Sequence, residues 1–486
     1  MKNITDIGIK KPRRPLKVVQ FGEGNFLRAF ADYFIDILNE KTDFNGSVAL
    51  VKPISYGSLE YFEQQNCLYT VILRGKEGGK TVNFHRIITS VDRAVDGSCT
   101  WEPMEELALC PTVRYVISNT TEAGIVLDES DTMESVPNTY PGKLTKFLYQ
   151  RYSAFSGAED KGLVILPVEL IEDNGRKLKD CVLRLAEVWK LPADFSLWVK
   201  DHCVFCNTLV DRIVTGYPKA EAEGLWKELG YRDDLLDVGE PFGLWVIESD
   251  RDLSDELPFA KAGLPVIFTE NQKPYRERKV RILNGAHTAS VLGAWLYGID
   301  IVRDMMNDAI AGKFVRRAVL EEIVPQVPLK EEDAKVFADA VFERFENPFI
   351  DHKLLDISLN SVSKWKTRVL PSLKDYYEKN RQLPQLLTFS FAALLAFYTS
   401  DDLQEDGLHA CRQDGVEYVV RDDRKVLEFF AQNSNLPTEE FVSLAARQEG
   451  FWGEDLCKYD GFTKTVALHL NSIRKDVKKA MEEISE

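Results

Sequence analysis

Three polar side chains suited to catalysis stand close together on one predicted helix: Lys279, Asn284 and His287. At about 100° per residue, Asn284 lies roughly 140° and His287 roughly 80° from Lys279, so the three share one side of the helix. A buried lysine can serve as a general acid/base, an asparagine amide can donate to a developing alkoxide, and a histidine can bind a substrate hydroxyl. The spacing therefore suggests an acid/base site. The alternative is a surface helix whose basic residues simply face water. From spacing alone, the acid/base site and the surface helix are equally favoured.

A glycine-containing loop forms a second candidate site. The segment Phe21-Gly22-Glu23-Gly24-Asn25-Phe26-Leu27-Arg28 runs from a predicted strand into a predicted helix. Glycines permit a tight turn and close approach of a pyrophosphate, while the helix N-terminus offers free N–H groups. Arg28 could add a charge-assisted contact to a phosphate. The pattern predicts a dinucleotide loop, although a third glycine is missing and an ordinary strand-to-helix turn is an equal alternative.

The cofactor's ribose and nicotinamide ends have weaker signals. Dinucleotide folds usually place an acidic residue after the second strand, but Val51-Lys52-Pro53 stands there. We therefore predict NAD and do not exclude NADP, because Lys52 could tolerate a 2′-phosphate. Thr120-Thr121-Glu122 follows a later strand end, where sheets of this kind face the ligand crevice. Thr120 is a candidate contact to the nicotinamide ribose, with a simple turn as the alternative.

The pattern of elements predicts how these residues are positioned. Short β-branched runs alternate with amphipathic helices in the first half, which implies a parallel, doubly wound sheet. After Pro274 the pattern is nearly all helical. We predict an α/β chain with a Rossmann-type domain at residues 1–270 and a mainly α-helical domain at residues 271–486. Predicted strands lie at 16–21, 48–51, 115–118 and 163–166, a hairpin at 69–88, and a helix at 25–40.

Composition narrows the class of function. The chain of 486 residues has 61 basic and 77 acidic residues, a net charge of −16, which argues against nucleic acid as a partner. An anionic substrate would need a local cluster of Lys and Arg. The longest apolar stretch, residues 386–398, is too short for a membrane span, and no signal peptide is visible. Eight scattered cysteines do not suggest a disulfide framework, so we expect a cytoplasmic protein. We interpret Cys203-x-x-Cys206 as structural and expect no metal.

Taken together, these motifs resemble the mannitol dehydrogenase family of polyol-specific long-chain dehydrogenases. The family patterns G-x-G-x-F-x-R and K-x4-N-x2-H stand here at 22–28 and 279–287. Within the family, residues 205–213, 241–248 and 279–288 resemble the members that interconvert tagaturonate and altronate. The resemblance covers essentially the whole chain.

The resemblance implies a Rossmann-type domain followed by a helical domain, and zinc-free hydride transfer between NADH and tagaturonate in hexuronate catabolism. It implies that Lys279 is the acid/base, that Asn284 and Asn174 stabilise the reacting oxygen, and that His287 and Lys364 bind substrate. Asp211 matches a family position near the active site, and we include it among the cofactor-binding residues.

The chain departs from the family at the missing ribose acid and around Asp356, where the arginine of the polyol members has no counterpart. The second departure favours a substrate other than mannitol. Lys364, Arg276 and Arg281 are candidates for the substrate carboxylate on charge alone. The alternatives are a fructuronate reductase or polyol dehydrogenase of the same family, and a non-catalytic dinucleotide-binding regulator.

Overall fold

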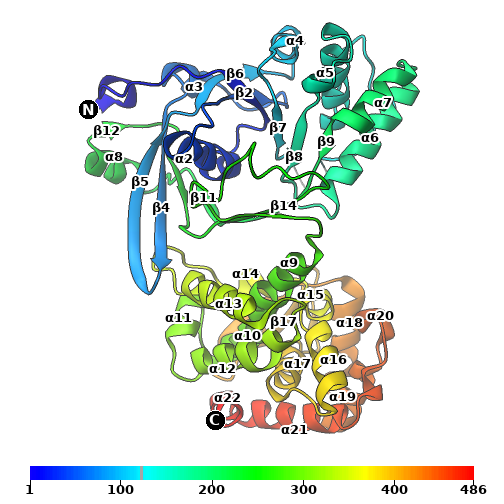
Figure 1. Cartoon of the computed structure of the whole chain (residues 1–486). Coiled ribbons are helices and arrows are strands. Elements are labelled where there is room, and N and C mark those ends of the chain that lie inside the picture. The colour runs from blue at the N-terminus through cyan, green and yellow to red at the C-terminus, as the bar shows by residue number, and fades with distance from the viewer. Residues whose placement is uncertain (121–123) are drawn as a thin grey trace. The chain divides into compact units, whose positions relative to one another are not determined.

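The computed structural model describes residues 1–120 and 124–486, which form two compact units (Figure 1). Unit 1 contains Met1–Arg74 and Val82–Gln272, and unit 2 contains Gly75–Thr81 and Lys273–Glu486. The sequence placed a boundary after residue 270. It did not predict that a hairpin tip from the first half, residues 75–81, would group with the helices of the second half.

The main sheet of unit 1 has six parallel strands in the order β6-β3-β2-β7-β8-β9. Counted along the chain, this is the order 3-2-1-4-5-6 of a dinucleotide-binding Rossmann sheet. The prediction of a parallel, doubly wound sheet is therefore confirmed. The strands are β2 (Leu16–Phe21), β3 (Ser47–Lys52), β6 (Val91–Asp96), β7 (Tyr115–Ser118), β8 (Val164–Pro167) and β9 (Val204–Phe205).

The central strands are mostly apolar because both faces of the sheet are covered. Alternate residues enter opposite cores: Val18 and Ile117 lie in one, and Val19 and Val116 in the other. The first core includes the helix after β2, formed by α1 (Asn25–Leu27), a π-helical segment (Arg28–Asp32) and α2 (Tyr33–Lys41). The second includes α4 (Glu102–Leu109), α5 (Tyr140–Ala154), α6 (Asn174–Val188) and α7 (Ala193–His202).

Smaller sheets complete unit 1. One has the order β11-β13-β4-β5 and contains the predicted hairpin, and another has the order β10-β14-β15. The strands are β4 (Tyr69–Glu77), β5 (Lys80–Ile88), β10 (Asn207–Asp211), β11 (Val214–Gly216), β13 (Asp237–Gly239), β14 (Leu244–Glu248) and β15 (Val266–Thr269). The short strands β1 (Lys2–Asn3) and β12 (Tyr231–Arg232) pair, and α3 (Glu60–Gln64) and α8 (Ala222–Leu229) lie between strands.

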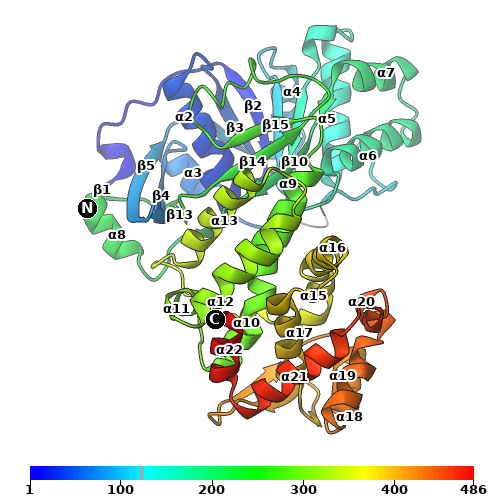
Figure 2. The same ribbon diagram turned by 60° about the horizontal axis from the view of Figure 1, so that its bottom comes forward.

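Unit 2 is built around one long helix. It begins as α9 (Lys273–Arg278), continues as a π-helical segment (Lys279–Asn284) and ends as α10 (Gly285–Tyr297). Most of α10 is buried, and it packs against α17 (Gln385–Phe397), which packs in turn against α21 (Phe462–Lys475) (Figure 2). A helix that is apolar on nearly all sides belongs in the interior of a domain.

The other helices of unit 2 surround this core. They are α11 (Val302–Asn307), α12 (Ala311–Arg317) with a π-helical extension (Ala318–Ile323), α13 (Glu331–Phe345), α14 (Leu354–Ile357), α15 (Ser361–Arg368), α16 (Leu370–Asn380), α18 (Arg424–Asn433), α19 (Thr438–Ala446), α20 (Glu449–Trp452) and α22 (Val477–Ser485). A small antiparallel sheet, β16 (Asp402–Leu403), β17 (Leu408–Cys411) and β18 (Glu417–Val420), was not predicted, because such short strands give little periodic signal.

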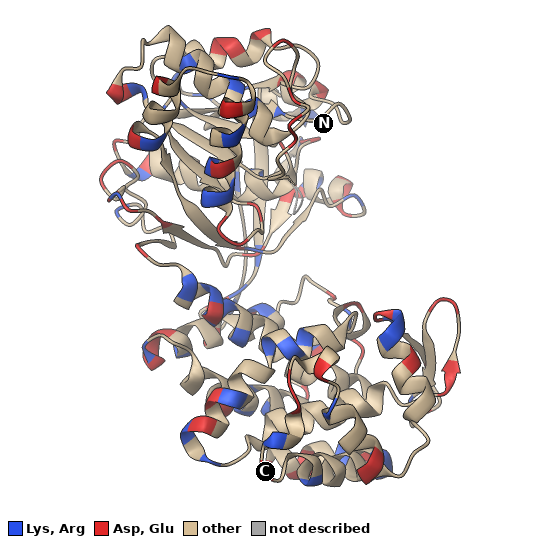
Figure 3. Ribbon diagram, turned by 90° about the vertical axis from the view of Figure 1, so that its right-hand side faces the viewer, with Lys and Arg blue, Asp and Glu red and all other residues tan. Residues whose placement is uncertain are grey.

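Charged residues are distributed along the elements of both units. Figure 3 shows basic and acidic positions interspersed along the helices of both units, so the excess of acidic residues is not gathered on one element. Within the described ranges, none of the helices has the length and apolar character needed to cross a bilayer.

One buried carboxyl in unit 1 has an unusual protonation equilibrium. Asp32 is fully buried, and its Oδ2 accepts hydrogen bonds from Tyr69 Oη (2.8 Å) and Gln20 Nε2 (3.4 Å). Burial raises the pKa of Asp32 to about 7, although these two hydrogen bonds lower it. The folded protein therefore binds a proton at Asp32 more tightly than the unfolded chain does.

We expect Asp32→Asn to change the pH dependence of stability. Because the folded pKa lies above the unfolded value of about 3.9, the stabilising effect of the protonated carboxyl is present at low pH and is lost as pH rises through 7. Between pH 5 and pH 8 the wild type should lose about 2–3 kcal/mol of unfolding free energy relative to the asparagine variant. Urea unfolding at both pH values measures this difference. Parallel curves for the two proteins would contradict the shift.

Candidate active site and nucleotide loop

The turn after β2 requires glycine at its first position. Gly22 has φ of +118°, and its N–H donates to Val51 O at 2.9 Å. A Cβ at this position would lie 2.9 Å from the backbone oxygen of Asn119, which follows β7. The turn lies between β2 and β7, where the strand order reverses, and open α/β sheets bind ligands at that point.

The second glycine leaves open space at the start of the helix. Gly24 is exposed and precedes the first residue of the helix 25–41, and a Cβ built on it would meet no atom within 4 Å. The first N–H groups of a helix lack partners within the helix and attract anions. The loop therefore fits a dinucleotide pyrophosphate, because its backbone can be approached closely at Gly24.

The two aromatic residues of the motif, Phe21 and Phe26, pack against other aromatic side chains of unit 1. Phe21 is fully buried, with its ring 5.0 Å from that of Tyr140, so only its backbone faces the turn. Its carbonyl accepts from Asn119 N at 3.1 Å. Phe26 stacks on Phe30 with ring centroids 5.1 Å apart. These contacts hold the turn and the first helical turn against the sheet.

The structure gives Arg28 a position different from the predicted one. Its side chain is 4% exposed, and its Nη1 donates to Leu235 O at 2.5 Å. Nη2 donates to Asn25 Oδ1, and the guanidinium lies over the ring of Tyr69 at 5.2 Å. The guanidinium is thus directed into unit 1, where it anchors the loop through Asn25. A direct contact between Arg28 and a phosphate stays a prediction that these contacts do not favour.

The ends of β7 and β8 are tied together by a carboxylate that we did not single out from the sequence. Glu169 is buried, and its Oε1 accepts from both the N–H and the hydroxyl of Thr120 at 3.1 Å. Its Oε2 accepts from Ser118 Oγ at 3.1 Å. Thr120 therefore lies at the carboxyl edge of the sheet, as expected, with its hydroxyl already bonded to Glu169. Thr121 and Glu122 lie outside the described residues.

Asn174 differs from its predicted role in the same region. It is fully buried at the start of α6, and its Nδ2 faces the carbonyls of Pro167, Glu169 and Thr208 at 3.0–3.1 Å. Its Oδ1 accepts from Gly175 N and Thr208 N at 2.9 Å. The amide joins the end of β8 to β10, so stabilisation of a reacting oxygen by Asn174 stays a prediction that these bonds do not favour. Asp211 is buried at the end of β10, and its predicted role is not tested.

In unit 2, a π turn brings two of the predicted catalytic residues into line. Gly285 N donates to Val280 O, five residues back, as in a π-helix. In an α-helix Lys279 and Asn284 would lie about 140° apart, but five-residue hydrogen bonding places them roughly one above the other. Isolated π turns occur often at functional sites. The sequence pattern, which assumes an α-helix, could not reveal this alignment.

The Asn284 amide is available for a ligand. Lys279 and Asn284 are both half-buried. The backbone oxygen of Asn284 accepts from Thr288 Oγ1 at 2.9 Å, but within residues 1–120 and 124–486 its side-chain amide has no hydrogen-bond partner. An amide without a protein partner that lies near a lysine can donate a hydrogen bond to the same substrate oxygen that the lysine protonates.

His287 is held as a neutral ring with one buried, unpartnered nitrogen. The ring stacks on Phe345 with centroids 4.0 Å apart and meets His352 edge-on at 5.6 Å. Nδ1 has no hydrogen-bond partner among the described residues. Burial lowers the pKa of His287 well below its usual range, and His352, Arg344, Arg368 and Lys364 lower it further. This nitrogen therefore has hydrogen-bonding capacity left for a water or a ligand hydroxyl.

These neighbours form a basic cluster around His287, which we define as Arg344, His352, Lys364 and Arg368. Lys364 and Arg368 lie one turn apart on α15, and Lys364 Nζ donates to Ile357 O at 2.9 Å. Within the described parts of the chain, His352, Lys364 and Arg368 form no ion pair. Like charges one helical turn apart repel each other, so an anion bound here would be stabilised. The sequence pointed to Lys364 alone, because the other three are distant in the chain or lacked a motif.

Arg281, another cationic candidate, has its partners outside this cluster. Arg281 forms ion pairs with Asp375 and with Glu277, the latter at 3.5 Å, and its Nη1 donates to Gln326 O. These partners make Arg281 a structural residue, which corrects its suggested role with a substrate carboxylate. Arg276 is half-buried on α9, and its role stays a prediction.

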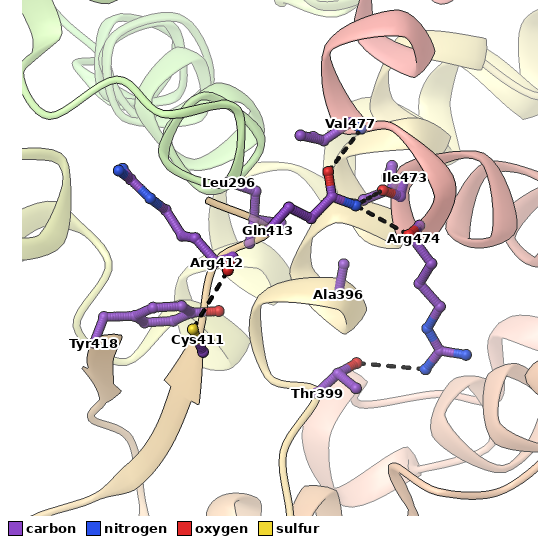
Figure 4. A pocket seen from close by; sticks show the side chains of 10 residues that line it. All are labelled: Leu296, Ala396, Thr399, Cys411, Arg412, Gln413, Tyr418, Ile473, Arg474 and Val477. Carbon is purple, nitrogen blue, oxygen red and sulfur yellow. Dashed lines mark hydrogen bonds between the residues drawn. The ribbon is translucent and has the colours of Figure 1, made fainter. Parts of the chain in front are cut away.

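Other features have no link to the predicted site. Cys203 and Cys206 are buried, and burial raises both thiol pKa values to about 12, so neither is poised as a thiolate. The searched residues contain no group of three or more side chains placed to hold a metal ion. A hollow of about 170 Å³ in unit 2 is lined by Gln413 and Arg474 (Figure 4). There the side-chain NH2 group of Gln413 donates to the carbonyls of Ile473 and Arg474. These hydrogen bonds lie within the protein and hold the wall of the hollow together.

Comparison with known proteins accounts for both units. Residues 16–260 match the Mannitol dehydrogenase Rossmann domain, and residues 271–474 match the Mannitol dehydrogenase C-terminal domain. Altronate oxidoreductase of Bacillus subtilis is 45% identical, over 96% of this chain and 95% of its own. That of Pectobacterium atrosepticum is 44% identical over 95% of each chain, and that of Escherichia coli is 43% identical over 99% of each.

Two solved structures share the fold. D-sorbitol dehydrogenase in substrate-free form aligns with a TM-score of 0.77 at 21% identity, over 96% of this chain and 95% of that one. Mannitol 2-dehydrogenase of Pseudomonas fluorescens, in ternary complex with NAD and D-mannitol, aligns with a TM-score of 0.65 at 21% identity, over 99% and 96%.

Proposed function

This chain belongs to the mannitol dehydrogenase family, and from that premise we propose that it is an NAD-dependent altronate oxidoreductase that interconverts D-tagaturonate and D-altronate. Relatives with that name, aligned over at least 94% of each chain, are 42% to 45% identical to it. In the direction of reduction, the ketone carbon gains a hydride and the ketone oxygen gains a proton. The oxidised nucleotide and the secondary alcohol are the products.

Unit 1 would hold the cofactor at the loop after β2. The backbone at Gly22 and Gly24 leaves room for the pyrophosphate, and the N–H groups at the start of the helix 25–41 would bind its oxygens. The nicotinamide, when bound, supplies or accepts the hydride. Glu169 fixes Thr120 at the carboxyl edge of the sheet, which is the edge that binds nucleotides in this fold.

Lys279 is the acid/base of the proposed reaction. Its ammonium group donates a proton to the substrate oxygen during reduction and takes it back during oxidation. Asn284 donates a hydrogen bond to the same oxygen while negative charge develops there. The observation that carries this assignment is the π turn, which aligns Lys279 with Asn284 while the Asn284 amide keeps its hydrogen bonds for a ligand.

His287 would position a substrate hydroxyl. Because its pKa is well below its usual range, the ring is neutral at neutral pH and offers one donor and one acceptor nitrogen. Nδ1, which has no partner among the described residues, is the atom that a hydroxyl would satisfy.

The basic cluster explains how an acidic protein would attract a sugar acid. The chain carries a net charge of −16, yet Arg344, His352, Lys364 and Arg368 surround His287. A carboxylate at one end of the substrate would be stabilised by Lys364 and Arg368, which form no ion pair within the described residues, whereas a neutral polyol would gain no charge pairing from them. This difference supports a uronate over a mannitol-type substrate.

Turnover of a substrate panel tests the proposed function. We expect the purified protein to oxidise NADH with tagaturonate at a kcat/KM at least about 100-fold above that with fructose, which lacks the carboxylate. The KM for tagaturonate should rise with ionic strength, because charge pairing is screened by salt. Equal or better turnover of fructose would contradict the uronate assignment. Preference for fructuronate would instead assign the chain to the sibling reaction.

A further inference from the structure

We infer that Asp96, paired with Lys52, makes the nucleotide site selective for NAD over NADP by presenting a carboxylate to the adenosine ribose. The inference rests on the proposed dinucleotide site and specifies which nucleotide it takes. It also explains how the chain can lack an acidic residue directly after its second strand.

The two residues end neighbouring strands of the Rossmann sheet. Lys52 is the last residue of β3 and Asp96 the last of β6, and they are opposite each other in the parallel register. Lys52 Nζ lies 2.8 Å from Asp96 Oδ2, and Gly97 N donates to Lys52 O at 3.0 Å. Both side chains therefore lie at the carboxyl edge of the sheet, on the side of β2 that in this fold binds the adenosine half of a dinucleotide.

The exposed half of the pair is the carboxylate. The Lys52 side chain is only 5% exposed, whereas that of Asp96 is 38% exposed. Asp96 Oδ1 also accepts from Ser98 N at 2.8 Å and from Ser98 Oγ at 2.5 Å, so the carboxylate is held in one orientation. Burial opposes ionisation, but the hydrogen bonds from Lys52 and Ser98 lower the pKa of Asp96 to about 2.

A second carboxyl, that of Glu23, lies near the same pair and adds to the acidic character of this part of the site. Glu23, in the loop after β2, is half-buried, and its carboxyl interacts electrostatically with both Lys52 and Asp96. Lys52 is thus neutralised from one side by Asp96 and faces Glu23 as well. A 2′-phosphate would meet exposed carboxylate, whereas a free 2′-hydroxyl could donate to it, since a carboxylate has about four acceptor sites.

This arrangement reverses the expectation based on Lys52 alone. A lysine after the second strand suggests tolerance of a 2′-phosphate, but here its charge is committed to Asp96 and its amine is buried beneath it. The acid that other dinucleotide folds carry at the end of the second strand is supplied by the end of the neighbouring strand.

Dissociation constants for NADH and NADPH, measured by titration calorimetry on the full-length protein, test the inference without relying on turnover. The wild type should bind NADH at least about 100-fold more tightly than NADPH, and Asp96→Asn should reduce that ratio at least about tenfold. We expect NADH to bind more weakly, because its ribose hydroxyl loses the carboxylate acceptor. We expect NADPH to bind more tightly, because Lys52 becomes available to the 2′-phosphate. Lys52→Met, which leaves the carboxylates uncompensated, should keep NADH binding and weaken NADPH binding further.

Asp92→Asn is the matched control. Asp92 lies on the same strand, is 42% exposed and pairs with Arg93, so its loss should leave the nucleotide ratio unchanged. If the Lys52–Asp96 ion pair had a purely structural role, Asp96→Asn and Lys52→Met would each change the dissociation constants for NADH and NADPH by the same factor. A ratio within twofold of wild type in both variants would overturn the inference and leave the proposed function intact. Failure of the wild type to bind either nucleotide would overturn the proposed function itself.

Discussion

Lys279→Ala is expected to lower kcat for tagaturonate reduction by about 10³-fold, because general acid catalysis by a positioned side chain contributes roughly 10²–10⁴-fold. The Kd for NADH should stay within about twofold of wild type, because the loop that would bind the pyrophosphate belongs to unit 1. The two quantities are measured separately, kcat from NADH absorbance at saturating substrate and Kd by titration calorimetry. Loss of turnover with retained binding identifies Lys279 as a group that acts in the chemical step.

The exposed Lys313, on α12 of the same unit, provides a matched control. Lys313→Ala removes the same functional group away from the π turn and should leave kcat unchanged. A Lys279→Ala enzyme that keeps more than about a tenth of the wild-type kcat would exclude Lys279 as the acid/base. Turnover by the wild type that Lys279→Ala abolishes would also exclude the non-catalytic regulator.

Gly24→Val should weaken NADH binding by at least about 100-fold while the protein stays folded, which is the second large effect we expect. A Cβ at Gly24 meets no protein atom within 4 Å, so the side chain fits the apoprotein. It would occupy the space through which a phosphate approaches the first N–H groups of the helix. Loss of two hydrogen bonds to a charged phosphate costs about 3–6 kcal/mol, which is 100-fold or more in Kd.

Gly22→Ala is the informative comparison for this variant. Gly22 has φ of +118°, and a Cβ there lies 2.9 Å from Asn119 O, so this substitution should lower the Tm as well as weaken binding. Thermal unfolding and NADH titration on both variants separate the two effects. A Gly24→Val protein that binds NADH as tightly as the wild type would remove the pyrophosphate from this loop.

Much of the fold was predictable because its signals are local. The run at 16–21 and the strand at 115–118 are observed with the predicted bounds, since an apolar β-branched segment between turns identifies a buried strand by itself. The helical character of the second half follows in the same way from its periodicity. The strands of the small sheet at 402–420 were missed because each is only two to four residues long.

The candidate site was predictable in part. The spacing of Lys279, Asn284 and His287 pointed to the helix that carries the proposed acid/base site, but it assumed α-helical geometry. The π turn changed the angle around the helix axis between Lys279 and Asn284. No pattern of residue types predicts such a turn. Arg28 and Asn174 match a motif, yet their hydrogen bonds are made inside unit 1. A motif specifies a residue type at a position, whereas its partners depend on the chain around it.

The sequence by itself determined the class of fold, the glycine loop at the end of the first strand and the helix that carries the proposed acid/base. These features are encoded within short segments, where residue type and period directly set backbone conformation. Only the tertiary structure decided which distant residues meet. The pairing of Lys52 with Asp96 depends on β3 lying beside β6, and the basic cluster around His287 depends on how α13, α14 and α15 pack around α10. Such contacts follow from the burial of apolar faces over the whole chain, so they have no local signature in the sequence.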